Sequence, residues 1–222
     1  LKCSSCGGTL FSSRRKTSRR YVCMSGPDHR GCGKRSVTAE PLEELIVAAV
    51  LYRLDTPQLA DVLGLPAPPN VIEGFDISHI SGTLTVASMV VAVNGVPAPQ
   101  RYRRFRIKTV QDIDDPMSIA EVVRRRYSRL KEEHQDMPDL IVIDGGKGQL
   151  ASALAELQAL RLKIPIVSLA KKEEEIYVPG LDSPLDLGKE EKASLYLQEI
   201  RDEAHRFALA YNRLLRKKAI DD

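Results

Sequence analysis

Two aspartates lie in apolar stretches of the chain that are typical of buried strands. Asp76 is part of VIEGFDISHI, and Asp144 ends LIVID. An ionised carboxylate inside a sheet is costly unless it is paired or binds a metal. Two such side chains on strands of one sheet could converge on Mg²⁺ or Mn²⁺, which favour oxygen ligands. We therefore expect both aspartates to hold a divalent cation, with a capping or turn role as the competing interpretation for either residue alone.

Three glycines follow Asp144 in the stretch GGKGQ, at Gly145, Gly146 and Gly148. Glycines let another backbone or a phosphate approach closely, and a helix expected to start near Gln149 would present free N–H groups. The GxxxxGK[ST] spacing of a nucleotide-hydrolysing loop is not met here, so we reject nucleotide hydrolysis. A metal held by the aspartates could instead polarise a phosphodiester and lower the pKa of a bound water.

His205 is a third candidate, because it lies in a segment of helical periodicity from about 191 to 217. The helix places it roughly a third of a turn from the centre of the apolar stripe, where it could reach the rim of the sheet. An ordinary boundary histidine is the alternative interpretation. The stripe consists of Leu197, Ile200, Ala204, Phe207, Ala208, Tyr211 and Leu215.

The four cysteines all lie in the first 32 residues, as C-x2-C followed by C-x8-C. Thiolates from Cys3, Cys6, Cys23 and Cys32 around one tetrahedral Zn²⁺ would supply the folding energy that so small and polar a segment lacks. The second spacing is longer than a tight knuckle needs, and His29 could substitute for a cysteine. Disulfides or free thiols are the remaining alternatives.

The charge is unevenly distributed along the 222 residues. Residues 1–37 carry a net charge of +8, whereas residues 67–222 carry −1. The basic start predicts a polyanionic partner, usually nucleic acid. No apolar run approaches the roughly 18 residues of a membrane span, and no leader is visible, so a cytoplasmic location is expected. Because the chain begins at Leu1 and ends without a closing signal, we expect a fragment.

The periodicity predicts the elements that must position these side chains. A helix is expected over 41–64, followed by a Pro-rich linker at 66–70. Three antiparallel strands are expected next, followed by helices and strands in the order α-β-α-β-α. This order predicts a mixed α/β sheet with helices on both faces, as in the ribonuclease H-like fold. Asp115 is the expected N-cap of the first of these helices. The later elements are expected at 116–134, 140–143, 149–161, 165–169 and 191–217.

Residues 1–60 resemble the zinc β-ribbon of large serine recombinases. The resemblance rests on LKCSSCGGTL, RRYVCMSGPDHRGCGKRSV and PLEELIVAAVLYRL. It implies DNA contact through basic residues on the loop between the ribbon strands, which would neutralise phosphates. A merely solvated basic loop is the alternative. The residues concerned are Arg14, Arg15, Lys16, Arg19 and Arg20.

Residues 71–218 resemble the C-terminal nuclease domain of the UvrC family of excinucleases. The matching motifs include FDISHISGTLTVASMVVAVNG, PDLIVIDGGKGQL and LYLQEIRDEAHRFALAYNRLLRKK. The resemblance implies a ribonuclease H-like fold and the metal-dependent incision on the 5′ side of a DNA lesion in nucleotide excision repair. Its Asp-Asp-His site carries over to Asp76, Asp144 and His205, with His205 as a further ligand or a proton carrier. Gly74 stands before FDISH, where the family often has a cysteine.

The resemblance also implies damaged double-stranded DNA and the UvrB–DNA complex as partners. No match is visible to the family's GIY-YIG nuclease, its UvrB-binding segment or its helix-hairpin-helix pair. We expect three regions: a ribbon plus helix at 1–65, a linker at 66–70 and a nuclease domain at 71–222. An endonuclease V-like enzyme acting on deaminated DNA, or a non-catalytic DNA-binding protein, are the alternatives. Phosphate contacts in the nuclease domain are expected from Arg103, Arg104, Arg106, Arg124, Arg125 and Lys147.

Overall fold

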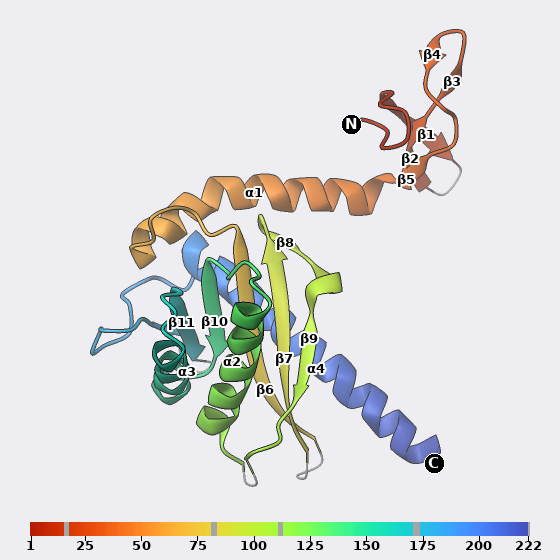
Figure 1. Ribbon diagram of the computed structural model, residues 1–222. Coiled ribbons are helices and arrows are strands. Elements are labelled where there is room, and N and C mark those ends of the chain that lie inside the picture. The colour runs from red at the N-terminus through yellow and green to blue at the C-terminus, as the bar shows by residue number, and fades with distance from the viewer. Residues whose placement is uncertain (16–17, 81–83, 111–112, 171–173, 222) are drawn as a thin grey trace. The chain divides into compact units, whose positions relative to one another are not determined.

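The computed structural model describes residues 1–15, 18–80, 84–110, 113–170 and 174–221. The chain divides into two compact units, Leu1–Leu51 and Tyr52–Asp222, and the division falls inside the helix α1 (Ala39–Leu63). Each unit is described by itself below (Figure 1). Among the described residues, no helix combines the length and the apolar character that crossing a membrane requires.

The Leu1–Leu51 unit is built on a small antiparallel sheet with the strand order β1-β2-β5. Its buried apolar residues in the described part are only Cys3, Cys23 and Ala39, so it has almost no hydrophobic core. A two-residue pair of strands, β3 and β4, projects from it (Figure 1). The strands are β1 (Leu10–Arg15), β2 (Ser18–Cys23), β3 (Ser25–Gly26), β4 (His29–Arg30) and β5 (Ser36–Thr38).

The Tyr52–Asp222 unit contains a mixed sheet with the order β12-β11-β10-β6-β7-β8, to which β9 adds by pairing with β7. The central strand β10 runs parallel to both β6 and β11, and the other pairs are antiparallel. The strands are β6 (Val71–Ile80), β7 (Leu84–Val93), β8 (Val96–Pro97), β9 (Arg103–Arg106), β10 (Leu140–Asp144), β11 (Ile166–Ala170) and β12 (Glu175–Tyr177); a 3-10 turn, η1, spans Pro99–Arg101.

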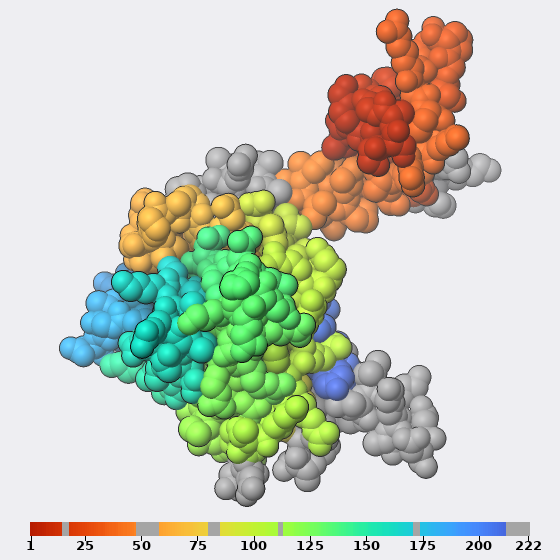
Figure 2. All heavy atoms as spheres, viewed as in Figure 1, coloured from red at the N-terminus to blue at the C-terminus, as the bar shows by residue number. Residues whose placement is uncertain are grey.

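Helices cover both faces of this sheet, which confirms the predicted fold class. The helices α2 (Asp115–Glu132) and α3 (Lys147–Ala159) lie together on one face, and α4 (Lys192–Asp221) crosses the other. The side chains of α2 and α3 form a continuous layer over the strands in Figure 2. One large apolar core fills the space between these layers.

The strand β6 contacts both helical layers, because its side chains alternate between the two faces of the sheet. Phe75 meets Tyr127 of α2 edge-on, with the ring centroids 6.3 Å apart. Gly74 faces α4, where an added Cβ atom would lie only 2.6 Å from Ile200 Cγ2. The residues of β6 that follow Gly74 by an even number therefore lie on the α4 side.

The observed helix starts differ by one or two residues from the predicted ones, since α1 begins at Ala39 rather than residue 41 and α4 at Lys192 rather than about 191. The N-cap of α2 is Asp114, whose Oδ1 accepts a hydrogen bond from the Met117 amide at 2.9 Å, and Asp115 is already the first helical residue. The helix α3 begins at Lys147 rather than near Gln149. Local hydrogen bonds mark the starts of α2 and α3: the Met117 amide donates to Asp114, and the Gly146 amide donates to Gln149 Oε1.

Glu121 ties the loop after β9 to α2 and is buried, with 2% of its surface exposed. Its carboxylate accepts hydrogen bonds from the amides of Lys108 and Thr109, from the Thr109 hydroxyl at 2.6 Å, and from Arg125 at 2.8 Å. Burial alone would raise the pKa of Glu121, but these donors outweigh it and lower the pKa to about 2. The ionised form is thus stabilised by folding.

The pKa of Glu121 predicts an acid-sensitive contribution to stability. A folded-state pKa below the unfolded value of about 4.3 gives stability that is complete above that value and is lost as the pH falls toward 2. Glu121→Gln should lower the free energy of unfolding by about 2 kcal/mol at pH 7 and flatten its pH dependence between pH 5 and 2. Urea titrations at several pH values measure both effects. Glu132→Gln, the same change at an exposed position of α2, is the control; equal behaviour of the two variants would contradict the assignment.

Gly74 should be intolerant of a side chain, because Ile200 Cγ2 and Val90 Cγ2 would lie 2.6 and 3.1 Å from a new Cβ atom. We expect Gly74→Ala to destabilise the protein by about 2 kcal/mol, as overpacking does. Ile200→Leu removes the clashing γ-methyl group, so a double-mutant cycle should recover part of the loss. Gly148→Ala is the control: its nearest neighbour would be 3.7 Å away, and helix propensity predicts a gain of about 0.5 kcal/mol.

Candidate metal centres

Asp76 and Asp144 lie side by side because β6 and β10 pair in parallel. The register of this pair ends with Ile143 opposite Phe75, so the two aspartates come next on their strands. Both are nearly buried, at 2% and 7% exposed. The apolar run of β10 fixes its last residue at the carboxyl edge of the sheet, which is why a carboxylate there is held rigidly.

His205 joins the two aspartates from α4. Its Nδ1 atom lies 3.6 Å from Asp76 Oδ2, and its side chain is 46% exposed. Ligand atoms of Asp76, Asp144 and His205 all lie within 4.8 Å of one another. The structure thus brings together three side chains that are 61 or more positions apart in the sequence, with the imidazole on the solvent side and the carboxylates inside.

The position of α4 determines whether His205 reaches this site. Ala204, which precedes it, is fully buried, and Gly74 of β6 lets the helix backbone approach the sheet. Phe207 and Tyr211 follow His205 on α4. The guanidinium of Arg104, on β9, lies 4.0 Å from the centre of the Phe207 ring and 4.5 Å from that of the Tyr211 ring. These contacts fix the helix on both sides of the histidine.

The donor set fits a hard divalent cation. Two carboxylates and one imidazole supply oxygen and nitrogen ligands, and Ser78 donates a hydrogen bond to Asp76 Oδ2 at 3.0 Å, which orients that carboxylate. Ser88, opposite Asp76 on β7, is fully buried and its hydroxyl has no hydrogen-bond partner among the described residues. A buried orphan hydroxyl beside the carboxylates is consistent with room for a polar ligand or water.

The glycines after Asp144 serve the start of α3. The Gly145 amide donates to Leu169 O at 3.0 Å, and the Gly146 amide donates to Gln149 Oε1 at the same distance. A Cβ atom on Gly145 would lie 2.8 Å from Gln149 Cδ, so only glycine lets this cap form. The positive end of α3 consequently begins three residues after Asp144, where it favours negative charge.

The basic residues expected to contact phosphates in this unit are mostly engaged within the protein. Arg103 donates to two backbone carbonyls, and Arg104 stacks on the aromatic rings of α4. Lys147 donates to Asp182 O at 2.7 Å. Arg124 lies 3.6 Å from Glu156, Arg125 pairs with Glu121, and the side chain of Arg106 is exposed.

Two polar clusters near the sheet were missed by the sequence reasoning. His79 Nε2 lies 2.7 Å from Asp115 Oδ1, and its Nδ1 lies 3.0 Å from Thr85 Oγ1, on the α2 side of the sheet. Glu73, 1% exposed, accepts hydrogen bonds from Arg126 and from the Tyr127 hydroxyl. The alternation of side chains along a strand could have indicated both clusters. The odd-numbered residues of VIEGFDISH face α2, and the even-numbered residues face α4.

The second candidate centre consists of the four cysteines of the Leu1–Leu51 unit. Their sulfur atoms lie within 4.8 Å of one another, with separations of 3.5 Å for Cys6–Cys23, 3.7 Å for Cys32–Cys23 and 3.8 Å for Cys3–Cys32. Four sulfurs about 2.3 Å from a tetrahedral ion lie about 3.8 Å apart, whereas a disulfide bond is about 2.05 Å long. All four are free cysteines, and the spacing fits one tetrahedral ion.

The surroundings favour a thiolate at Cys6 and disfavour one at Cys23 in the absence of an ion. The Gly8 backbone, followed by Cys23, lowers the pKa of Cys6 to about 6, whereas burial raises the pKa of Cys23 to about 11. The Cys32 amide donates to Cys23 Sγ at 3.2 Å, and a Cβ atom on Gly31 would lie 2.6 Å from that sulfur. His29 stays outside the group and packs against Phe11, with the ring centroids 4.6 Å apart and the ring planes tilted by 52°.

The basic residues of the ribbon have different surroundings. Arg14 and Arg19 are opposite each other on β1 and β2, and Arg19 is ion-paired with Glu43. Arg20 donates to Ser36 Oγ at 3.0 Å. Arg15 ends β1, with its side chain outside the described part, and Lys16 lies outside the described residues.

Comparison with known proteins finds one family model that matches each of the two regions. Residues 60–209 match the model of the UvrC RNAse H endonuclease domain, and residues 1–51 match that of the recombinase zinc beta ribbon domain. The UvrABC system protein C of Methanosarcina mazei is 67% identical over 162 residues, covering 73% of this chain and 31% of that protein. The protein of the same name from Synechococcus sp. (strain JA-3-3Ab) is 53% identical, covering 72% and 26%.

Among solved structures, endonuclease V of Ciona intestinalis in complex with inosine-containing DNA superposes with a TM-score of 0.47 at 13% identity. The likeness covers 81% of this chain and all of the other. The chain spans about a third or less of the length of the curated relatives named above. The match over residues 60–209 extends across most of the chain and includes Asp76, Asp144 and His205, and the chain therefore belongs to the family of UvrC RNase H endonuclease domains.

Proposed function

We propose that the chain is a metal-dependent DNA endonuclease of nucleotide excision repair, which makes the incision on the 5′ side of a lesion. The observation that carries the proposal is the meeting of Asp76, Asp144 and His205, whose ligand atoms lie within 4.8 Å of one another. Relatives named UvrABC system protein C support the repair context. The ribbon's match to the recombinase family supports DNA as the partner.

Mg²⁺ or Mn²⁺ is the proposed cation, and Asp76 and Asp144 are its proposed ligands. When bound, such an ion polarises the phosphodiester and lowers the pKa of a coordinated water. Ser78 holds Asp76 through its hydroxyl, so the carboxylate stays oriented without the ion. His205, half exposed beside the carboxylates, is placed to complete the ligand set or to carry a proton between the site and solvent.

The substrate, the partner, the location, the ribbon's ion and the domain bounds complete the proposal. We propose damaged duplex DNA as substrate, presented in a complex with UvrB, and a cytoplasmic location, which suits four free cysteines. Zn²⁺ is the proposed ion of the ribbon. The proposed domains are the ribbon plus helix at 1–65, the linker at 66–70 and the nuclease at 71–222.

Incision assays test the nuclease proposal. The substrate is a duplex with one bulky adduct, loaded with UvrB and already nicked on the 3′ side, so that only the 5′ incision is measured. We expect cleavage that requires Mg²⁺ or Mn²⁺, and a loss of about 10²-fold or more in Asp76→Asn, Asp144→Asn and His205→Gln. Asp136→Asn, the same change at an exposed position, should retain activity.

Two results would count against this assignment. Undiminished cleavage by Asp144→Asn would contradict the assigned metal-dependent mechanism. DNA binding by the wild-type chain without any metal-dependent cutting would instead indicate a non-catalytic DNA-binding protein. Inosine-containing duplex serves as a parallel substrate, since preferential cutting there would point to deaminated bases. Mn²⁺ titration followed by electron paramagnetic resonance gives a readout besides activity, and the affinity should fall in both aspartate variants.

Removal of zinc should affect one unit selectively. We expect one Zn²⁺ per wild-type chain, bound through the four cysteines because so small a unit has almost no core of its own. Cys32→Ser should lose the ion and unfold residues 1–38, while amide signals from Tyr52 onward stay in place. His29→Ala should keep the ion, because the ring packs against Phe11. Metal analysis and amide NMR measure the two effects; zinc loss in His29→Ala would show that the ligand set is wrong.

A further inference from the structure

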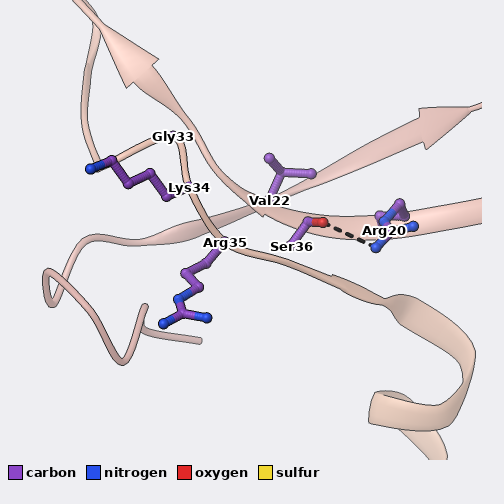
Figure 3. A pocket seen from close by; sticks show the side chains of 6 residues that line it. All are labelled: Arg20, Val22, Gly33, Lys34, Arg35 and Ser36. Atoms are coloured by element: carbon purple, nitrogen blue, oxygen red, sulfur yellow. Dashed lines mark hydrogen bonds between the residues drawn. The ribbon is translucent and has the colours of Figure 1, made fainter.

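A hollow of about 360 Å³ lies on the Leu1–Leu51 unit, where β2 runs beside the segment that enters β5 (Figure 3). We call it the β2–β5 pocket. Every charged residue that lines it is basic, and no acidic residue of the described chain lines it. Its lining consists of Arg20, Val22, Gly33, Lys34, Arg35 and Ser36.

Strand alternation separates two consecutive arginines near this pocket. Arg19 faces Glu43, with which it forms an ion pair, and the Tyr21 hydroxyl donates to the same carboxylate at 2.7 Å. Arg20 points to the opposite face, as the next residue of a strand must. The charge of Arg19 is therefore compensated within the unit, whereas Arg20 faces the pocket.

Arg20 has hydrogen-bonding capacity to spare. Its Nη2 donates to the neutral Ser36 hydroxyl at 3.0 Å, and its Nε is buried without a hydrogen-bond partner in the part of the unit that the structure describes. A guanidinium carries five N–H donors and stays charged at any physiological pH. Arg20 lines the pocket, and the described lining holds no acidic group to compensate its charge.

Lys34 and Arg35 add two charges to the same hollow. The only side-chain hydrogen bond found for Arg35 in the described part of the chain is to another neutral group, the Ser5 hydroxyl, at 2.8 Å. Gly33, with φ +68°, turns the chain immediately before them, and a Cβ atom there would lie 2.7 Å from Ser25 Oγ. The turn thus places consecutive cations at the rim without an acidic neighbour in the described lining.

The directions of these side chains indicate the form of the anion. In Figure 3 the side chains of Arg20, Lys34 and Arg35 fan out from the strand edge instead of converging on one point. A compact ion needs converging donors, whereas a sugar–phosphate backbone offers charges in succession. We propose that the β2–β5 pocket binds the backbone of duplex DNA, with Arg20, Lys34 and Arg35 contacting phosphates.

This inference rests on DNA being the partner in the proposed function, but not on cutting. The two can fail separately, because binding is measured on the zinc-loaded full chain carrying Asp144→Asn, without Mg²⁺ or Mn²⁺. Absence of incision in the earlier assay leaves this experiment unaffected. Loss of a phosphate contact here would equally leave the metal site intact.

The affinity for two duplexes of unrelated sequence is measured by fluorescence anisotropy over a range of salt concentrations. Lys34→Gln and Arg20→Gln should each weaken binding about 3- to 10-fold, equally for both sequences, and should each reduce the slope of log K against log salt by about 1. Lys2→Gln is the matched control: it removes the same charge from the same unit, but Lys2 bonds to Thr9 outside the pocket. It should leave the slope unchanged.

Lys34→Gln is the decisive variant, because among the described residues the Lys34 side chain makes no hydrogen bond that the fold would lose. Zinc content and the amide NMR spectrum verify that each variant is folded. If Lys34→Gln and Arg20→Gln both behave like Lys2→Gln, the proposal is overturned. It is equally overturned if inorganic phosphate at constant ionic strength shifts the pocket's NMR signals while neither variant alters DNA binding, since the pocket would then take a small anion.

Discussion

The parallel pairing of β6 with β10 is the constraint on which the candidate site depends. It places two nearly buried carboxylates next to each other at the edge of the sheet. Ligand oxygens within 4.8 Å repel by about 3 kcal/mol even at an effective dielectric of about 20, in addition to the cost of burying each charge. Ser78 offsets part of that cost for Asp76. A divalent cation would offset both the repulsion between the carboxylates and the cost of burying their charges. The cost of holding the two carboxylates together without a cation therefore favours cation binding.

The same strand organises the rest of the nuclease unit, because its residues alternate between two helical layers. Toward α2 it presents Glu73 and Phe75; Glu73 forms a buried cluster with Arg126 and Tyr127, and burial next to Glu73 raises the pKa of Tyr127 well above its usual value. Toward α4 it presents Gly74 and the candidate metal ligand Asp76. The four-residue stretch from Glu73 to Asp76 therefore anchors one helix by a buried ion pair and lets the other approach because Gly74 has no side chain. This explains why His205, which is half exposed, is still held near the carboxylates.

Much of this arrangement was predictable from the sequence, and what was missed has physical reasons. The apolar runs and turn residues predicted the strands, the helices on both faces and the fold class, and the motifs predicted which three side chains should meet. Partners of charged residues were not predictable. Arg104 was expected to bind phosphate but stacks on Phe207, and Glu121 was overlooked although four donors surround it. A sequence shows that a charge is present, but only the tertiary structure shows which group neutralises it. Where two aspartates are adjacent, as at Asp114 and Asp115, the sequence pattern led to the wrong one as the helix N-cap.

The metals proposed for the two centres would serve opposite purposes, and the surroundings of each centre fit its proposed purpose. The ribbon buries almost no apolar surface in its described part, and the proposed Zn²⁺, held by four soft thiolates, would supply the missing stability. The nuclease unit has a large core that does not involve its carboxylates, so that fold has no need of tight metal binding. Asp76, Asp144 and the half-exposed imidazole of His205 would hold a hard cation through oxygen and nitrogen ligands, which suits weak binding. Ligand chemistry would thereby separate the two proposed ions, because thiolates discriminate against Mg²⁺ and carboxylates favour it.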